Sequence, residues 1–244
     1  GSHVAAVAGR TLKKTVLELG GSDPFIVLED ADLKAAVATA VTARMLNQGQ
    51  SCIAAKRFIV LDSVASAFEK ALKEAFESLK PGDPLDPETQ VGPLARPDLV
   101  EDIERQVAGS IAAGARLVTG GKKMSRPGCF YEPTILSDVR SGMAVYTEET
   151  FGPVAAIITA GSEEEAISVA NDTEFGLGGC VWTENVARGE AVARKVNTGA
   201  MFVNGMTKSD PRLPFGGTGR SGYGRELGAY GIKEFVNIKT IWIR

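Results

Sequence analysis

The sequence predicts an α/β fold in which a mainly parallel sheet is flanked by helices, followed by a C-terminal strand that has no partner within the chain. Short apolar stretches, such as residues 58–61, alternate along the chain with longer segments of helical periodicity. This alternation is typical of parallel sheets. Glycine makes up 28 of the 244 residues, a high content that points to many tight turns.

The first elements follow from apolar spacing and from the residues that interrupt it. We expect a helix to end within residues 4–14 and a strand at 15–19, which Gly20 and Gly21 stop. A second strand follows at 25–28. Apolar residues at helical spacing then predict a helix. A further strand comes next, and after it an amphipathic helix with one apolar stripe. These three elements are expected at 32–46 (helix), 57–61 (strand) and 64–79 (helix).

The remaining elements begin after a proline-rich loop at 81–97, which holds four of the eleven prolines. Gly114 ends the next helix, and Gly120 and Gly121 close the strand after it. Ser162 is the N-cap of a later helix, with Glu165 at the capping-box position. In order, the expected elements are 99–113 (helix), 116–119, 134–136 and 154–160 (strands), 162–171 (helix), 179–182 (strand), 186–196 (helix), 200–204 (strand) and 235–243 (exposed strand).

Charge and cysteine content exclude several classes of function. Lys and Arg number 27 against 30 acidic residues, so the net charge is −3, which argues against nucleic acid or an acidic membrane as the partner. No apolar run is long enough to span a bilayer, and no signal peptide opens the chain. The three cysteines lack CxxC spacing and accompany one histidine. We therefore expect no metal site, no disulfide scaffold and a reducing, cytoplasmic environment.

Cys52 is the first candidate for chemistry, because it lies in a polar, glycine-containing turn between an expected helix and an expected strand. Such a turn can present a thiol at a cleft. The alternative is a buried cysteine that packs as a small hydrophobe. A cysteine protease is excluded, because the only histidine is His3, in the N-terminal segment that resembles a cloning remnant.

Two carboxylates are the candidate bases. Glu18 lies between two leucines at the end of an apolar strand. There its carboxylate either reaches solvent at the end of the strand or is buried. In the second case its pKa is raised, because burial disfavours the charged form. The alternative is an edge-strand glutamate that faces water. Glu149 lies in the segment Glu148-Glu149-Thr150-Phe151-Gly152-Pro153, for which the alternative is an ordinary acidic turn.

Together these segments resemble the NAD(P)-dependent aldehyde dehydrogenase superfamily. The resemblance rests on Glu-Leu-Gly-Gly at 18–21, Gly-Gln-Ser-Cys at 49–52, Glu-Glu-Thr-Phe-Gly-Pro at 148–153 and Pro-Phe-Gly-Gly at 214–217. The spacings among Glu18, Cys52 and Glu149 also match. The resemblance extends from about residue 4 to residue 244, and within the family it is strongest to bacterial succinate-semialdehyde dehydrogenases.

The resemblance implies a role for each matching residue. Cys52 would attack the aldehyde, and its backbone N–H would help to hold the oxyanion. Hydride would pass to the nicotinamide of NAD or NADP, and Glu18 would activate the water that hydrolyses the resulting thioester. Glu149 would bind the nicotinamide ribose, and Phe151 would pack beside the nicotinamide. A glutamate at position 18 favours hydrolysis over transfer to coenzyme A.

The resemblance also implies domain boundaries. Full family members are about twice as long, so we expect a catalytic fragment with little activity of its own. Residues 1–3 resemble a cloning remnant, 4–19 the end of a cofactor domain, 20–227 the catalytic domain and 228–244 a C-terminal segment with an oligomerisation strand. In the family this strand joins a neighbouring subunit, which implies a homodimer or homotetramer.

One glycine pattern is a decoy. Residues 217–222 match the dinucleotide fingerprint G-x-G-x-x-G literally. That motif must follow a strand and open a helix, with an acid about 20 residues further on. Here Pro214 and Phe215 precede it, and Trp242 stands where the acid should be. We expect a glycine-rich loop beside the active site instead.

The substrate pocket departs from the best-known members of that branch. Their carboxylate-binding arginine, six residues before the nucleophile, is replaced here by Leu46. Ser51 precedes the nucleophile and is assigned to the same pocket. The longer loop that follows 203–205 offers Lys208 or Arg212 as a positive charge, unless both are solvated loop residues. Succinic semialdehyde is the expected substrate, a small-molecule aldehyde.

Two alternatives stay open at this point. The same chemistry could act on lactaldehyde or on an aromatic or sugar-derived aldehyde. A rival from another class is a non-catalytic folding or assembly module whose thiol is idle. A substrate panel on the full-length parent separates the aldehydes. Selective alkylation separates the non-catalytic module from the enzyme, because a reactive Cys52 should label faster than Cys129 and Cys180.

Overall fold

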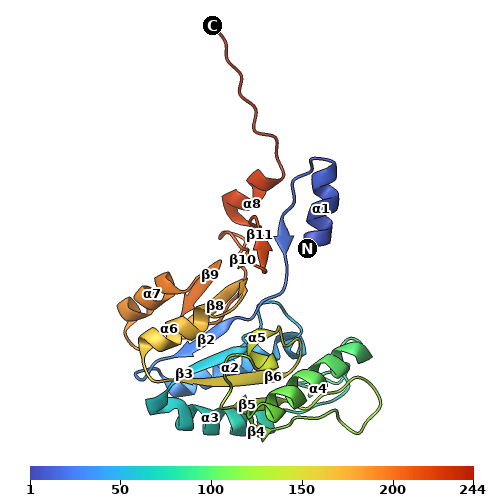
Figure 1. Cartoon of the computed structure of the whole chain (residues 1–244), viewed down its shortest axis with the longest axis vertical. Coiled ribbons are helices and arrows are strands. Elements are labelled where there is room, and N and C mark those ends of the chain that lie inside the picture. The colour runs from blue at the N-terminus through green and yellow to red at the C-terminus, as the bar shows by residue number, and fades with distance from the viewer.

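A seven-stranded sheet organises the computed structural model, which describes residues 1–244 (Figure 1). Its strand order is β4-β5-β6-β3-β2-β8-β9. Only β4 runs antiparallel to its neighbour; every other pair is parallel. The bounds are β2 (Pro24–Val27), β3 (Arg57–Leu61), β4 (Arg116–Thr119), β5 (Thr134–Ser137), β6 (Val154–Ala160), β8 (Gly178–Trp182) and β9 (Ala200–Val203). The predicted fold class is therefore confirmed.

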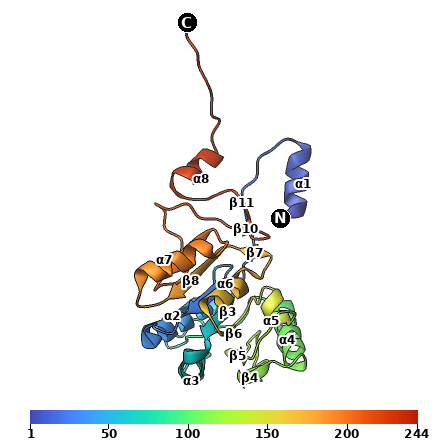
Figure 2. The same cartoon turned by 60° about the vertical axis from the view of Figure 1, so that its left-hand side comes forward.

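Helices cover both faces of this sheet (Figure 2). Side chains of a strand alternate between the faces, so Phe25 and Phe58 pack with one layer while Ile26 and Ile59 pack with the other. The first layer holds α2 (Leu33–Met45) and α3 (Asp62–Glu77). The second holds α4 (Pro97–Ala112), α5 (Ala144–Thr147), α6 (Glu163–Asn171) and α7 (Val186–Lys195).

The helix starts follow local capping rules. Asp32, Ser162 and Asn185 cap α2, α6 and α7 through side-chain oxygens that accept backbone N–H groups. Pro97 occupies the first turn of α4, two residues before the expected start, because proline lacks only an N–H that has no helical partner there. Helix α3 also begins two residues early, at Asp62, an acidic residue that favours the first turn.

Short strands build a smaller region next to the main sheet. Strand β1 (Leu17–Glu18) pairs with β11 (Gly222–Tyr223), and β7 (Phe175–Gly176) pairs with β10 (Thr218–Gly219). The glycine pattern at 217–222 therefore forms parts of two strands and the turn between them, and no helix follows it directly. The fingerprint interpretation is excluded by this geometry.

The N-terminal helix ends within the expected range, whereas the C-terminal end of the chain differs from expectation. Helix α1 spans Ser2–Arg10 and has no buried residue; Leu12 then adopts a φ of 53° and breaks the helix before Lys14. Helix α8 (Gly228–Glu234) precedes the C-terminal tail, which extends away from the body (Figure 1). The strand expected at 235–243 is not formed, because a strand needs a paired backbone and none lies beside the tail. No helix is long and apolar enough to cross a bilayer.

Candidate active site

Cys52 lies at the amino end of the parallel strands. The loops before β2, β3, β6 and β8 converge there, since the amino ends of parallel strands meet at one edge of a sheet. After α2 the chain makes a tight 3₁₀ turn (η1, Leu46–Gly49), in which Asn47 and Gln48 adopt left-handed conformations. This turn delivers the Cys52 loop, defined here as residues 49–54, into the site.

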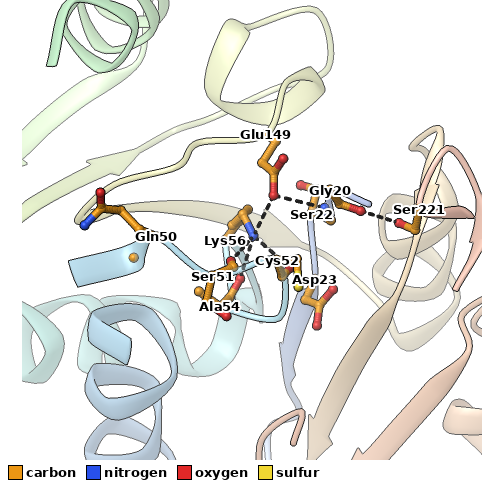
Figure 3. Close-up of polar contacts among 12 residues, drawn as sticks. Gly20, Ser22, Asp23, Gln50, Ser51, Cys52, Ala54, Lys56, Glu149 and Ser221 are labelled. Atoms are coloured by element: carbon orange, nitrogen blue, oxygen red, sulfur yellow. Dashed lines mark hydrogen bonds and ion pairs between the residues drawn. The ribbon is translucent and has the colours of Figure 1, made fainter. Parts of the chain in front are cut away.

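The side chain of Lys56 lies beneath the Cys52 loop and is fully buried. Its ammonium group donates to the carbonyl oxygens of Ser51, Cys52 and Ala54 at 3.1, 3.0 and 3.1 Å. It also pairs with the carboxylate of Glu149 at 3.6 Å (Figure 3). One buried cation therefore holds both the Cys52 loop and the second candidate carboxylate.

Arg44 fixes the start of the same loop from α2. Its guanidinium donates to the carbonyl oxygen of Gly49 at 2.8 Å and to that of Val154, at the start of β6, at 3.3 Å. Gly49 has a φ of +76°, and a Cβ there would collide with the Gly152 carbonyl oxygen. Only glycine fits this close approach.

The thiol of Cys52 is half-buried, and none of the three cysteines is in a disulfide. Burial raises its pKa above the usual value, while the nearby ammonium of Lys56 lowers it and the carboxylates of Asp23 and Glu149 raise it. Burial also raises the pKa of Cys180 far above its usual value. Of the charged groups around Cys52, Lys56 is the one that favours the thiolate.

Glu149 is anchored as a hydrogen-bond acceptor. One carboxylate oxygen accepts the Gly21 N–H at 3.0 Å and faces Lys56, and a Cβ at Gly20 would collide with the other oxygen. Glu149 and Phe151 line a cavity of about 250 Å³ whose remaining walls are Glu148 and one face of α4. A carboxylate and an aromatic ring at such a cavity suit a sugar hydroxyl and a flat ring.

Glu18 has different surroundings. Its two carboxylate oxygens are buried and have no hydrogen-bond partner, and one would lie 2.8 Å from a Cβ at Gly216. Burial raises its pKa and the charge of Glu226 adds to this rise, whereas the charge of Arg225 and the nearby backbone N–H of Gly217 oppose it. The raised pKa agrees with one of the possibilities considered from the sequence. The alternative, an edge-strand glutamate that faces water, is wrong, because both carboxylate oxygens are buried. No hydrogen bond joins Glu18 to Cys52 in this structure.

The structure places the other predicted pocket residues at varied depths. Leu46 begins η1 and is 39% exposed, and Ser51 is half-buried beside Cys52. Lys208 is exposed. Arg212 is exposed, and its guanidinium donates hydrogen bonds to the carboxylate of Asp210 at 2.9 and 2.6 Å. Neither Lys208 nor Arg212 has a hydrogen bond or ion pair with the Cys52 loop.

Sequence reasoning missed four buried charged residues: Asp23, Arg44, Lys56 and Arg57. Asp23 accepts the Gly178 N–H at 3.1 Å, and its second oxygen is buried without a partner. The signal in the sequence was weak: Lys56 directly precedes an apolar strand and Arg57 opens it. Arg57 is also buried and donates to the carbonyl oxygens of Ser22, Val169 and Ala170.

The fold and the site together define an α/β domain built around a sheltered cysteine, two carboxylates and a buried lysine, as in enzymes that use a cysteine nucleophile. The chain belongs to the aldehyde dehydrogenase family, whose sequence profile matches residues 1–241. No group of three or more histidine, cysteine or acidic side chains is arranged to hold a metal ion.

Relatives and solved structures agree with this assignment. The chain is 57% identical to a probable succinate-semialdehyde dehydrogenase [NADP(+)] of Synechocystis, covering 100% of this chain and 54% of that protein. A succinate-semialdehyde dehydrogenase [NADP(+)] 1 of Mycobacterium tuberculosis is 53% identical, with 100% and 53% covered.

Among solved structures, succinic semialdehyde dehydrogenase of Streptococcus pyogenes in complex with NADP+ superposes with a TM-score of 0.97 at 45% identity, covering 100% of this chain and 53% of that one. Betaine aldehyde dehydrogenase of Staphylococcus aureus in complex with NAD+ gives 0.93 at 34% identity, covering 96% and 49%. The chain thus spans about half the length of the relatives it matches.

Proposed function

We propose that this chain is the catalytic part of an NAD(P)-dependent aldehyde dehydrogenase that oxidises succinic semialdehyde to succinate. The observation that carries the proposal is the half-buried Cys52 whose loop is bound, through Lys56, to Glu149 at the edge of a cavity. The names of its relatives support the substrate. The same chemistry on another aldehyde is the alternative.

In the first half of the proposed reaction, the thiolate of Cys52 attacks the aldehyde carbon and forms a C–S bond. The carbonyl electron pair moves to the oxygen, which the backbone N–H of Cys52 stabilises. NAD or NADP, when held by Glu149 and Phe151, would supply the acceptor for the hydride that this carbon loses. What remains on Cys52 is a thioester.

In the second half, Glu18 takes a proton from a water molecule, which attacks the thioester carbon. The C–S bond breaks, the acid leaves and the thiolate of Cys52 is restored. A carboxylate whose oxygens lack partners, and whose pKa is raised by burial, is suited to this task, because a general base works best with a pKa near the working pH.

Glu149 and Phe151 would hold the nicotinamide end of NAD or NADP. The Glu149 carboxylate is fixed by the Gly21 N–H, so it can accept hydrogen bonds from ribose hydroxyls without reorganising. Several relatives are named for NADP+, and others are solved with NAD+. We propose that the chain by itself turns over little aldehyde, because it spans about half the length of its relatives.

We also propose assembly into a homodimer or homotetramer in the cytoplasm through residues 235–243. Phe235, Ile238 and Trp242 are 78%, 82% and 86% exposed in the single chain, and an unpaired extended segment with such side chains favours association. Light scattering of the purified chain tests this, and a monomeric mass would contradict it.

An ester substrate tests the cysteine chemistry without any cofactor. An activated ester such as p-nitrophenyl acetate acylates a thiolate directly and releases p-nitrophenolate, giving the same kind of thioester. We expect release that depends on Cys52 and is lost in Cys52→Ala. We also expect iodoacetamide to label Cys52 before Cys129 and Cys180. Equal, slow labelling of all three would instead indicate a non-catalytic module.

A further inference from the structure

Lys56 has no part in the proposed steps, yet it makes the densest set of polar contacts in the site. Three of its contacts are backbone carbonyl groups of the Cys52 loop, and the fourth is the carboxylate of Glu149 (Figure 3). A buried ammonium ion loses its hydration, so it persists only when such groups replace the water. The position of the Lys56 ammonium group therefore constrains both the Cys52 loop and Glu149.

The first consequence concerns the direction of the backbone. Because the carbonyl oxygens of Ser51, Cys52 and Ala54 all point at Lys56, the peptide groups between them have a fixed orientation. The N–H of Ala54 is used within the loop, where it donates to Ser51. The N–H of Cys52 donates to no atom of the protein. It is thus available to a ligand.

The second consequence is electrostatic. The charged groups that act on the Cys52 thiol are Lys56, Asp23 and Glu149, and the two acids disfavour the thiolate. Lys56 itself faces Arg44, Asp23, Glu149 and Cys52. Burial lowers the pKa of Lys56 to about 8, so the ammonium form still predominates at neutral pH. Lys56 is then the charge that offsets the two acids.

We propose that Lys56 is a positioning residue for the Cys52 reaction: it holds the loop carbonyls so that the Cys52 N–H faces the substrate oxygen, and it supplies the positive charge that favours the thiolate. This role rests on the proposed function. Through Glu149 the same ammonium also sets the distance between the thiol's loop and the acceptor that would bind the nicotinamide ribose.

The test compares Lys56→Met, which removes the charge, with Lys56→Arg, which keeps it in another shape. Lys34→Met, at an exposed site in α2, is the matched control. Iodoacetamide alkylation of Cys52 is followed against pH by mass spectrometry. Alkylation needs only the thiolate, so we expect Lys56→Met to be about tenfold slower at pH 7 with its profile moved to higher pH, while Lys56→Arg and Lys34→Met follow the wild type.

Acylation by p-nitrophenyl acetate then reports on geometry, because it needs the oxyanion site as well as the thiolate. We expect Lys56→Met to lose more in acylation than in alkylation, and Lys56→Arg to lose acylation alone. Cys180, buried in the core, should stay unlabelled if the variants fold. If Lys56→Met exposes Cys180, the arginine variant alone carries the test.

The outcomes are distinct. An unchanged alkylation profile and unchanged acylation in folded Lys56→Met, or equal loss of both rates in Lys56→Arg, would overturn the role of Lys56. A wild-type chain whose Cys52 forms no acyl intermediate would instead overturn the proposed function, and the alkylation profiles would still decide whether Lys56 tunes the thiol.

Discussion

The Glu149 region and the Glu18 region of the site hold their carboxylates by opposite means. Glu149 accepts a backbone N–H and faces the buried ammonium of Lys56. The oxygens of Glu18 are buried against Gly216 and have no partner. A carboxylate that is held by donors is fixed in place, whereas burial without donors raises the pKa of a carboxylate. The two environments therefore suit a ligand acceptor and a base, respectively.

The two regions also differ in how the chain builds them. Arg44 of α2 and Lys56, the residue before β3, hold the Glu149 region at the amino edge of the main sheet. Backbone contacts among glycines and two-residue strands form the Glu18 region. Ser221 connects the two: its hydroxyl donates to the Gly20 carbonyl at 2.7 Å and accepts the Gly176 N–H at 3.0 Å.

The largest expected effect separates the two carboxylates by function. In Glu18→Gln, Cys52 should still be acylated by p-nitrophenyl acetate, giving one equivalent of p-nitrophenolate, but hydrolysis of the thioester should slow by about 100-fold or more. Burst kinetics and the mass of the acylated chain measure this. Glu101→Gln, at an exposed site in α4, is the control. Turnover by Glu18→Gln at the wild-type rate would remove Glu18 from the mechanism.

The pH dependence of the same reaction sharpens the comparison. Burial raises the pKa of Glu18 from 4.5, and only the ionised form accepts a proton, so deacylation should fall as the pH drops through the raised pKa. Stability follows the opposite sign. The folded state binds this proton more tightly than the unfolded state, so the Glu18 contribution to stability declines as pH rises above 4.5. In Glu18→Gln, the free energy of unfolding measured by denaturation should no longer show this decline with pH.

The second prediction concerns the packing of the Glu149 region. Gly49→Ala should lower the free energy of unfolding by about 3 kcal/mol, because it combines a left-handed backbone with a clash against a carbonyl group. Gly109→Ala is the matched control, because no atom lies within 4 Å of the Cβ that this change adds. Alanine in place of glycine within a helix should raise the free energy of unfolding by about 0.5 kcal/mol. Urea denaturation measures both. Equal stabilities would show that the loop can move away from Gly152.

How far the sequence predicts this molecule depends on whether a feature is local. Every strand of the main sheet was predicted. The six parallel strands were found because a buried parallel strand is a short apolar run whatever its neighbours are. The antiparallel edge strand β4 was found because Gly120 and Gly121 close it. The short strands β7, β10 and β11 were not, since two-residue strands exist only where distant segments pair. Strand β1 is shorter than the expected 15–19 for the same reason.

The candidate site divides in the same way. Cys52, Glu18 and Glu149 were named from their motifs, and the raised pKa of Glu18 was considered because leucines flank it. The burial of Lys56 could not be predicted, because a lysine before an apolar strand fits a solvated strand end equally well. Its burial depends on carbonyl groups of a loop whose conformation is set by Gly49 and Arg44.

The smallest expected effect concerns the loop between β9 and β10. Thr207 is buried, and its hydroxyl would lie 2.8 Å from a Cβ at Gly178, next to Asp23. The Pro211 carbonyl accepts the N–H of Gly228 at the start of α8. Lys208 lies between these anchor points along the chain and is exposed.

If Lys208 binds the substrate carboxylate, its removal should weaken only charged acyl groups. We expect Lys208→Ala to slow acylation by p-nitrophenyl hydrogen succinate by no more than about fivefold, because exposed charge pairs are weak. Acylation by the uncharged p-nitrophenyl butyrate should not change. Arg212→Ala should have a smaller effect, since Asp210 already engages that guanidinium. Equal slowing with both esters would instead mean that the loop shapes the site and does not select the charge.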